Sequence, residues 1–253
     1  MLFSIICYKL LHEDKGIIIC NFRPMMILYE DNHLIAVNKL AGTLVQGDRT
    51  GDKPLADMVK GYIKKKYNKP GDVFLGVPHR IDRPVGGVVL FCRTSKALER
   101  VTVMFKDQKM EKTYLAIVGI VPPKKQGVLV DHLVKNHEKN ISYVVKEGST
   151  NSKRCELSYD LISSGRDAHL LMVKPVTGRP HQIRVQLANL GSPILGDLKY
   201  GAKKPLRDAT ICLHAFGLQF QHPVTKEDIK LQSEPPANKQ WSWFNKLINS
   251  IKL

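Results

Sequence analysis

Residues 79–92 read HRIDRPVGGVVLFC, a basic cluster with one aspartate that runs into an apolar stretch. The apolar part, residues 88–92, is too short for a helix and rich in β-branched valine, so it predicts a buried strand. Pro84 disfavours the helical state in the residue before it, and Gly86-Gly87 permit unusual torsions or the close approach of another backbone. Asp82 is therefore expected on a loop at the edge of a sheet, a position that suits a functional residue.

Asp82 stands between Arg80 and Arg83, and two interpretations of it are open. It could be a turn aspartate that pairs with one of these neighbours, which is the usual state of an isolated instance. It could also be a catalytic carboxylate held ionised for chemistry on an anionic substrate. The two interpretations make different predictions about the rest of the chain.

The segments around this stretch alternate strands and helices without internal repeats. Residues 26–38 predict two short strands joined by a turn, and Thr94-Ser95 predict the cap of a helix whose apolar face extends to Phe105. No Gly/Ser/Pro linker divides the chain, so residues 25–253 are expected to form one mixed α+β domain with a partly antiparallel sheet. Residues 1–24 are expected to be a peripheral extension, or to lie upstream of the natural start. Further strands are expected at 113–120, 141–146, 155–162, 168–175 and near 211–220, and further helices at 54–68 and 180–190.

The charge of the chain narrows the class of protein. The 253 residues are 43% hydrophobic and 25% charged, which is ordinary, but the net charge of +16 and the pI of about 9.6 are not. Such an excess favours contact with phosphate backbones or an anionic membrane surface, although a merely basic, solvated protein would also show it. The membrane alternative is the weaker one, because no helix combines a basic face with a large apolar face.

The cysteines and the short motifs exclude several classes of site. The five cysteines are widely spaced without a CxxC pair, which indicates a reducing cytoplasm and neither a disulfide framework nor a zinc site. His132, His137 and Cys155 lack metal-ligand spacing, so no metal is expected. The loop GTLVQGD at 42–48 has two glycines of a phosphate loop, but Asp48 stands where the lysine must be. No cofactor is therefore expected.

Two further segments complete a set with Asp82. KTYLAIVG (112–119) alternates so that Tyr114 shares a face with two small apolar residues, although Tyr114 could simply be a core tyrosine with a satisfied hydroxyl. TGRPHQIRVQLANLG (177–191) predicts a helix with Pro180 at its first position and Gly191 at its C-terminal end.

The helix at 180–190 predicts a partner for Asp82. Three apolar residues form its buried stripe, three amides lie along one edge of the stripe, and Arg184 and His181 lie along the other. Arg184 is therefore semi-buried at the core boundary, where an unpaired guanidinium would be costly, so it requires a carboxylate. The alternative is an amphipathic helix with an ordinary flanking arginine. The stripe is Ile183, Leu187 and Leu190, and the amides are Gln182, Gln186 and Asn189.

Four motifs in sequence order carry a family resemblance. HRIDRPVGGVVLF, KTYLAIVG, TGRPHQIRVQLANLGSPILGDLKYG and LHAFGLQFQHP together resemble the RluA-type family of RNA pseudouridine synthases, over roughly residues 26–235. The resemblance implies the pseudouridine synthase catalytic fold, a bent, mainly antiparallel mixed sheet with flanking helices and a central cleft. Too few residues precede the first strand for the family's S4-like RNA-binding domain, which this chain is expected to lack. Val85-Gly86-Gly87 and Pro180 depart from the family pattern without removing a catalytic group.

The resemblance also implies an activity and its residues. The protein is expected to isomerise specific uridines in ribosomal or transfer RNA, without a cofactor. The family's catalytic aspartate matches Asp82, its active-site tyrosine matches Tyr114, and the arginine that pairs with the aspartate matches Arg184. Asp82 is therefore expected within salt-bridge reach of Arg184 and close to Tyr114, at the floor of a basic cleft. Residues expected to contact RNA are His79, Arg80, Arg83, Arg179, His181, Gln182, Lys64 and Lys65.

A non-catalytic RNA-binding protein on the same fold is the alternative from another class. It would keep the basic surface but could lose Asp82, Tyr114 or Arg184, and all three are present. The protein is further expected to be a monomer that binds RNA and no membrane.

Overall fold

One ten-stranded sheet forms the framework of the protein. The computed structural model describes residues 25–48 and 50–253, so the extension expected at 1–24 lies outside the described residues. The strands follow the order β1-β2-β3-β9-β4-β8-β7-β5-β6, and β10 pairs with β9. They are β1 (Met26–Glu30), β2 (Leu34–Lys39), β3 (Gly86–Cys92), β4 (Glu111–Val118), β5 (Gln126–Asn136), β6 (Ile141–Val145), β7 (Lys153–Ser164), β8 (His169–Pro175), β9 (Leu213–Gln221) and β10 (Asp228–Gln232).

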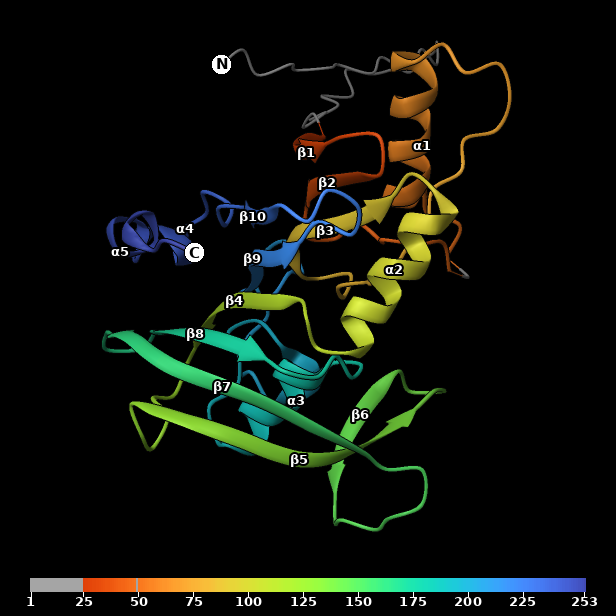
Figure 1. Ribbon diagram of the computed structural model, residues 1–253. Helices are drawn as coiled ribbons and strands as arrows, with labels where there is room; N and C mark the ends of the chain where they lie inside the picture. The colour runs from red at the N-terminus through yellow and green to blue at the C-terminus, as the bar shows by residue number, and fades with distance from the viewer. Residues whose placement is uncertain (1–24, 49) are drawn as a thin grey trace.

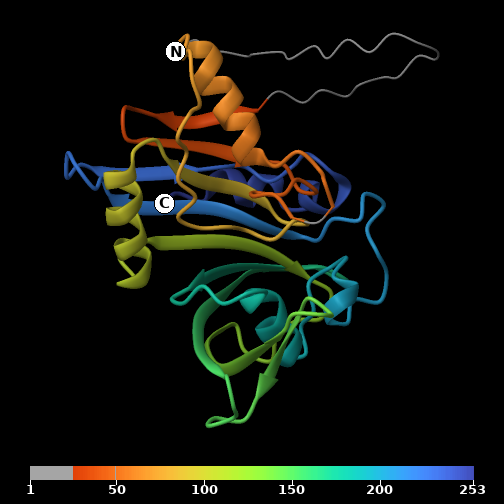
Figure 2. The same ribbon diagram turned by 90° about the vertical axis from the view of Figure 1, so that its right-hand side faces the viewer.

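The pairing is antiparallel between all neighbouring strands except β3 and β9, which run parallel. This confirms the predicted α+β class with a mainly antiparallel mixed sheet. The sheet bends, so that β5 to β8 curve away from the strands at the other end (Figures 1 and 2). The helices are α1 (Leu55–Lys66), α2 (Ser95–Lys106), α3 (Gln182–Asn189), α4 (Lys239–Ser242) and α5 (Asn245–Ser250), with a 3-10 turn η1 (Leu198–Tyr200).

The helices cover the sheet in two groups. The larger hydrophobic core includes buried residues of α1, α3, α4 and α5, whereas α2 packs with β1–β3, β9 and β10 in a second core. β2 contributes to both cores, because Ile35 and Val37 face the first while Leu34 and Ala36 face the second. α3 contacts β5, β6 and η1, within the curved end of the sheet (Figure 1).

The glycine pair of the HRIDRPVGG stretch allows the parallel contact between β3 and β9. Gly86 pairs with His214 and Gly87 with Ala215. Gly87 has φ of +119°, and a Cβ at this position would overlap the carbonyl group of Ala215. The predicted close approach of another backbone is therefore confirmed. Because of this pairing, β3 begins at Gly86, two residues before the predicted position. The pairing also fixes the end of the loop that precedes β3.

Most of the predicted elements are confirmed, but four were not predicted. These are β5, β10 and the two C-terminal helices α4 and α5. The start of α3 was also wrong: the helix begins at Gln182, because His181 has left-handed backbone angles with φ of 56° and interrupts it after Pro180. None of the helices within the described ranges has the length and apolar character needed to span a bilayer.

Candidate active site

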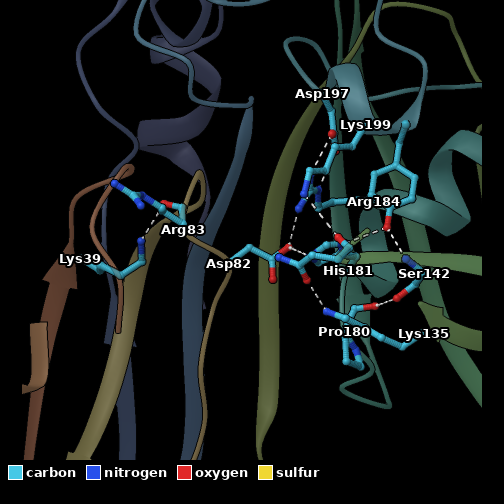
Figure 3. Close-up of polar contacts among 12 residues, drawn as sticks. Lys39, Asp82, Arg83, Lys135, Ser142, Pro180, His181, Arg184, Asp197 and Lys199 are labelled. Atoms are coloured by element: carbon cyan, nitrogen blue, oxygen red, sulfur yellow. Dashed lines mark hydrogen bonds and ion pairs between the residues drawn. The ribbon is translucent and has the colours of Figure 1, made fainter. Parts of the chain in front are cut away.

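The loop that carries Asp82 is held by the end of β2. The amine of Lys39, 1% exposed, donates hydrogen bonds to the carbonyls of Thr43 (2.7 Å) and Arg83 (3.2 Å). The Gly42 N–H donates to the same Arg83 carbonyl at 2.7 Å. Burial lowers the pKa of Lys39 to about 7, against the opposing effect of the Asp82 charge. In Figure 3, Lys39 and Arg83 lie on one side of Asp82 and Arg184 lies on the other.

Asp82 forms an ion pair with Arg184, which is the contact that the sequence predicted. Arg184 Nη1 donates to Asp82 Oδ2 at 2.9 Å (Figure 3). The Asp82 side chain is 27% exposed and that of Arg184 only 5%, so the guanidinium lies deeper than the predicted semi-buried position. The alternative interpretation, in which Asp82 pairs with Arg80 or Arg83, is therefore wrong, since Arg83 instead binds Asp52 at 2.6 Å.

A second carboxylate, which was not predicted, holds the other edge of the guanidinium. Asp197 is 1% exposed and accepts from Arg184 Nε at 2.7 Å and from Nη2 at 2.8 Å. Burial opposes the charge on Arg184, but the two carboxylates outweigh it and raise its pKa further. The bidentate contact fixes the plane of the guanidinium and leaves Nη1 directed at Asp82. Asp197 belongs to the quoted GDLKYG segment, and the cost of a buried guanidinium was the signal that could have found it.

Tyr114 lies on β4 between β8 and β9, where it pairs with Val173 and Ala215. The register of the β4–β9 pair shifts between Thr113 and Tyr114. Burial, together with the negative charge of Asp82, raises the pKa of the Tyr114 hydroxyl well above its usual value. The hydroxyl therefore stays protonated at neutral pH. The effect of the Asp82 charge supports the expected closeness of the two side chains, and the catalytic role of Tyr114 stays a prediction.

His181 lies next to the ion pair and is held by a hydrogen-bond network. Its Nε2 is 4.0 Å from Asp82 Oδ2, and its Nδ1 is 2.8 Å from the Tyr200 hydroxyl. The same hydroxyl accepts from the Ser142 N–H at 2.8 Å, and Ser142 Oγ donates to the Pro180 carbonyl at 2.7 Å. The network joins β6, the start of α3 and η1. The network also places the GDLKYG turn (196–201) against the site.

Further cations surround Asp82 from the side of β5. Burial lowers the pKa of Lys135, and the nearby cations Lys199, Arg184 and Arg80 lower it further while Asp82 raises it. Lys135 Nζ donates to Asn140 Oδ1 at 2.6 Å, so its position is defined. Arg80 is exposed. The carboxylate thus lies in an electropositive surrounding, which suits an anionic ligand.

Two of the residues expected to contact RNA have structural roles instead. His79 Nε2 accepts from the Leu90 N–H at 2.9 Å and its ring stacks on Phe105, and burial lowers its pKa to about 4. Gln182 is 4% exposed. Its amide donates to the Glu156 carbonyl at 3.0 Å and accepts from the Thr177 hydroxyl at 2.7 Å and the Arg179 N–H at 3.0 Å. Gln182 therefore supports the loop before α3.

The other expected RNA contacts are spread over the surface. Arg179 Nε donates to the Arg154 carbonyl at 3.2 Å, and Arg83 is held by Asp52. Lys64 and Lys65 are exposed on α1, which lies at the opposite end of the molecule from α3 in both views (Figures 1 and 2). Their contact with RNA stays a prediction, as it does for Arg80 and His181.

Two surface pockets in the described ranges lie elsewhere. One is formed by residues 46–48, 51, 52 and 54, the start of α1 and residues 75 and 77, and the other by residues 242–247. Asp82 lines neither pocket, and it lies between Arg184 on one side and Lys39 with Arg83 on the other (Figure 3). Among the residues with described positions, no three His, Cys, Asp or Glu side chains are grouped to hold a metal ion.

The paired Asp82 and Arg184, with Tyr114 beside them on this bent sheet, define a class of protein that comparison with known proteins identifies. Residues 33–189 match the family model described as RNA pseudouridylate synthase. The chain belongs to this family, which places it among the isomerases that act on uridine in RNA. No part of the match depends on residues 1–24.

Named relatives and solved structures agree with the family. The chain is 30% identical over 236 residues to ribosomal large subunit pseudouridine synthase C of Vibrio vulnificus, covering 90% of this chain and 69% of the relative. It is 32% identical over 220 residues to the protein of the same name from Escherichia coli, covering 82% of this chain and 66% of the relative. The chain thus spans about two thirds of the length of these relatives. Human RNA Pseudouridylate Synthase Domain Containing 4 has the same fold, with a TM-score of 0.70 at 26% identity, covering 83% of this chain and 88% of that one.

Proposed function

We propose that this protein converts uridine to pseudouridine in large-subunit ribosomal RNA, with Asp82 as the catalytic carboxylate. The observation that carries the proposal is the 2.9 Å ion pair between Asp82 and an arginine that Asp197 holds in place. The names of the relatives favour ribosomal over transfer RNA as the substrate. The free cysteines Cys92, Cys155 and Cys212 are buried, which fits the reducing cytoplasm that we propose as the location.

The reaction breaks the N1–C1′ bond of the nucleotide, turns the uracil and joins C5 to C1′, and the proton of C5 is released. The target uridine must leave its stack to reach Asp82, as in other base-modifying enzymes. Asp82 then acts on the sugar carbon, on C6 of the base or on a sugar proton, and all three routes use a carboxylate whose direction Arg184 fixes.

Tyr114 and the cations have supporting roles in this proposal. The raised pKa of Tyr114 makes its phenolate scarce, so the ring is better suited to stack on the uracil than to remove the C5 proton. Arg80 and Lys135 are near neighbours beside Asp82 and suit contact with the phosphates of the target strand. We propose that a monomer carries out the reaction, because Asp82, Tyr114 and Arg184 all come from one chain.

Tritium release tests the proposal. A large-subunit rRNA transcript with tritium at C5 of uridine should lose tritium to water with the wild-type protein, and Asp82→Ala should release none. Asp72→Ala, which changes an exposed carboxylate outside the site, is the matched control and should behave as wild type. Equal release by wild type and Asp82→Ala would overturn the assignment and favour a non-catalytic RNA-binding protein. A tritiated transfer RNA transcript in a parallel reaction distinguishes the two kinds of substrate.

A further inference from the structure

The imidazole of His181 presents one nitrogen to the catalytic carboxylate without bonding to it. Nε2 lies 4.0 Å from Asp82 Oδ2, which is too long for a hydrogen bond. The His181 side chain is 7% exposed, and the Asp82 carboxylate is 27% exposed and so accessible to a ligand. In the described ranges, no other group lies within hydrogen-bonding distance of His181 Nε2. A polar ligand atom between the two side chains could therefore form a hydrogen bond with His181 Nε2 and another with Asp82 Oδ2.

The hydrogen-bond network favours one position for the proton of the His181 ring. The Tyr200 oxygen already accepts the Ser142 N–H, so its own O–H requires an acceptor. Within the described part of the chain, His181 Nδ1 at 2.8 Å is the acceptor within reach of this hydroxyl. With the Tyr200 hydroxyl as donor in this contact, Nδ1 is assigned as the unprotonated nitrogen. A neutral ring then carries its proton on Nε2, and this N–H is directed at Asp82.

The surroundings favour the neutral ring. Burial lowers the pKa of His181 most, the nearby cations lower it further, and the Asp82 carboxylate opposes them. Of the groups that face the ring, only Asp82 favours the charged imidazolium, and it already pairs with Arg184. The charged and titratable groups that face the ring are Asp82, Arg184, Lys135, Lys199 and Tyr200.

We propose that the Nε2–H of His181 and Oδ2 of Asp82 together bind the ribose 2′-hydroxyl of the target nucleotide. A hydroxyl oxygen about 2.8 Å from each atom can donate to the carboxylate and accept from the imidazole at the same time. Nothing else on an internal uridine does both at one oxygen, because the uracil carbonyls only accept and the other sugar oxygens are esterified or part of the ring. The inference rests on the proposed function and deepens it, because His181 would recognise the 2′-hydroxyl, the group that distinguishes RNA from DNA.

The first test is a binding cycle between His181 and the 2′-hydroxyl. The probe is the fragment of a large-subunit rRNA transcript in which the wild type forms pseudouridine, made with uridine or 2′-deoxyuridine at that position. His181→Ala should weaken binding of the uridine fragment about tenfold, the worth of one hydrogen bond to a polar group, and leave the deoxyuridine fragment nearly unaffected. His181→Gln, which keeps a donor at a similar reach, should recover most of the loss.

The controls separate recognition from folding. His33→Ala, on the turn between β1 and β2, should leave both affinities unchanged. A purely structural role of His181 would weaken both fragments by the same factor, because a general loss of site geometry does not depend on the 2′-hydroxyl. Equal factors would therefore overturn the proposal.

The second test reads the proton directly. Long-range ¹⁵N spectra of the imidazole should show a protonated Nε2 and an unprotonated Nδ1 at neutral pH, and Tyr200→Phe should shift the balance toward Nδ1–H. Tyr143→Phe, at an exposed position of β6, is the matched control and should leave the spectrum unchanged. A charged ring, or Nδ1–H in the wild type, would refute the inference.

The same spectra test the His181 contact independently of the proposed function. If no transcript gains pseudouridine, the proposed function fails, and the inference is judged from titrations with uridine 5′-monophosphate and 2′-deoxyuridine 5′-monophosphate. Only the ribonucleotide should shift the His181 Nε2 signal. Identical shifts with both nucleotides, or none with either, would count against it.

Discussion

Replacement of Asp197 by alanine should destabilise the protein and disable the site together. Asp197 is buried and accepts two hydrogen bonds from Arg184, at 2.7 and 2.8 Å. A hydrogen bond to a charged group contributes about 1.5–3 kcal/mol, and breaking a buried ion pair costs about 3–5 kcal/mol. Because Asp82 still compensates part of the Arg184 charge, we expect the free energy of unfolding to fall by about 3 kcal/mol, the lower end of the range for a broken buried ion pair.

Such a loss is large against the total stability of a typical domain, about 5–15 kcal/mol. Urea unfolding followed by fluorescence measures it, and tritium release at a temperature where the variant stays folded measures the activity. Activity should fall because the freed guanidinium can turn its whole edge toward Asp82 and change the direction of the carboxylate. Asp72→Ala is the control for the loss of an exposed carboxylate.

A double variant separates stability from catalysis. Arg184→Met with Asp197→Leu replaces the buried charges by apolar groups of similar size, and such replacements are often neutral or stabilising. Stability should return to within about 1 kcal/mol of the wild type, the range of a tolerated core replacement, while activity stays lost. The reasoning would be refuted if the free energy of unfolding of Asp197→Ala lay within about 0.5 kcal/mol of the wild-type value, which is the usual effect of a surface substitution.

Three further predictions concern other parts of the molecule. The lowered pKa of Lys39 means that the unfolded chain binds more protons between about pH 7 and 10.5, so urea midpoints of the wild type should rise with pH over this range relative to Lys39→Met. Gly87→Ala should cost more than about 2 kcal/mol, because its Cβ would overlap Ala215, whereas Gly61→Ala, in open space on α1, should stabilise by about 1 kcal/mol; thermal unfolding compares the two. Arg80→Ala should weaken RNA binding and reduce the slope of log K against log salt by about 0.7–0.9, as measured by fluorescence anisotropy at several salt concentrations.

The sequence predicted the centre of the site because two independent arguments met at one residue. Helical spacing placed Arg184 at the core boundary, where it required a carboxylate, and the family resemblance paired it with Asp82. The structure confirms this contact between residues more than a hundred positions apart in the sequence. Asp197 lies only 13 residues from Arg184, yet it was not predicted, because the argument required a single carboxylate and stopped once it had one.

Strand β5 was not predicted either, because polar residues interrupt its apolar pattern. Its outer residues include Asp131, His132 and Lys135, which interrupt the apolar pattern on which strand prediction depends. Asp131 and Lys135 lie on one face of the strand and serve the site: Asp131 accepts from the Gln186 amide at 2.7 Å, and Lys135 lies near Asp82. His132 lies on the other face, where its Nε2 is 3.8 Å from Glu147 Oε1. A strand that supplies partners to a buried polar helix does not alternate in the usual way.

For helix α3, the periodicity of the sequence did not predict how deeply its polar side chains are buried. The amphipathic pattern predicted polar edges on Gln182, Arg184 and Gln186, but all three are buried, at 4%, 4% and 1% exposure. Buried polar side chains need hydrogen-bond partners, and here these come from Glu156, Asp131 and Asp197, in other elements. The Gln186 amide nitrogen is bonded in this way, whereas its Oε1 has no partner among the described residues.

The burial of these polar groups has a consequence for the chemistry. Since the polar side chains of α3 are tied to β5, β7 and Asp197, the helix cannot shift without breaking several hydrogen bonds at once. The direction of Arg184, and with it that of Asp82, is therefore set by the curved end of the sheet as a whole. Substitutions on β5 and β7 that leave Asp82 untouched should disturb the site through α3, which is how a rigid carboxylate can be maintained on an otherwise exposed loop.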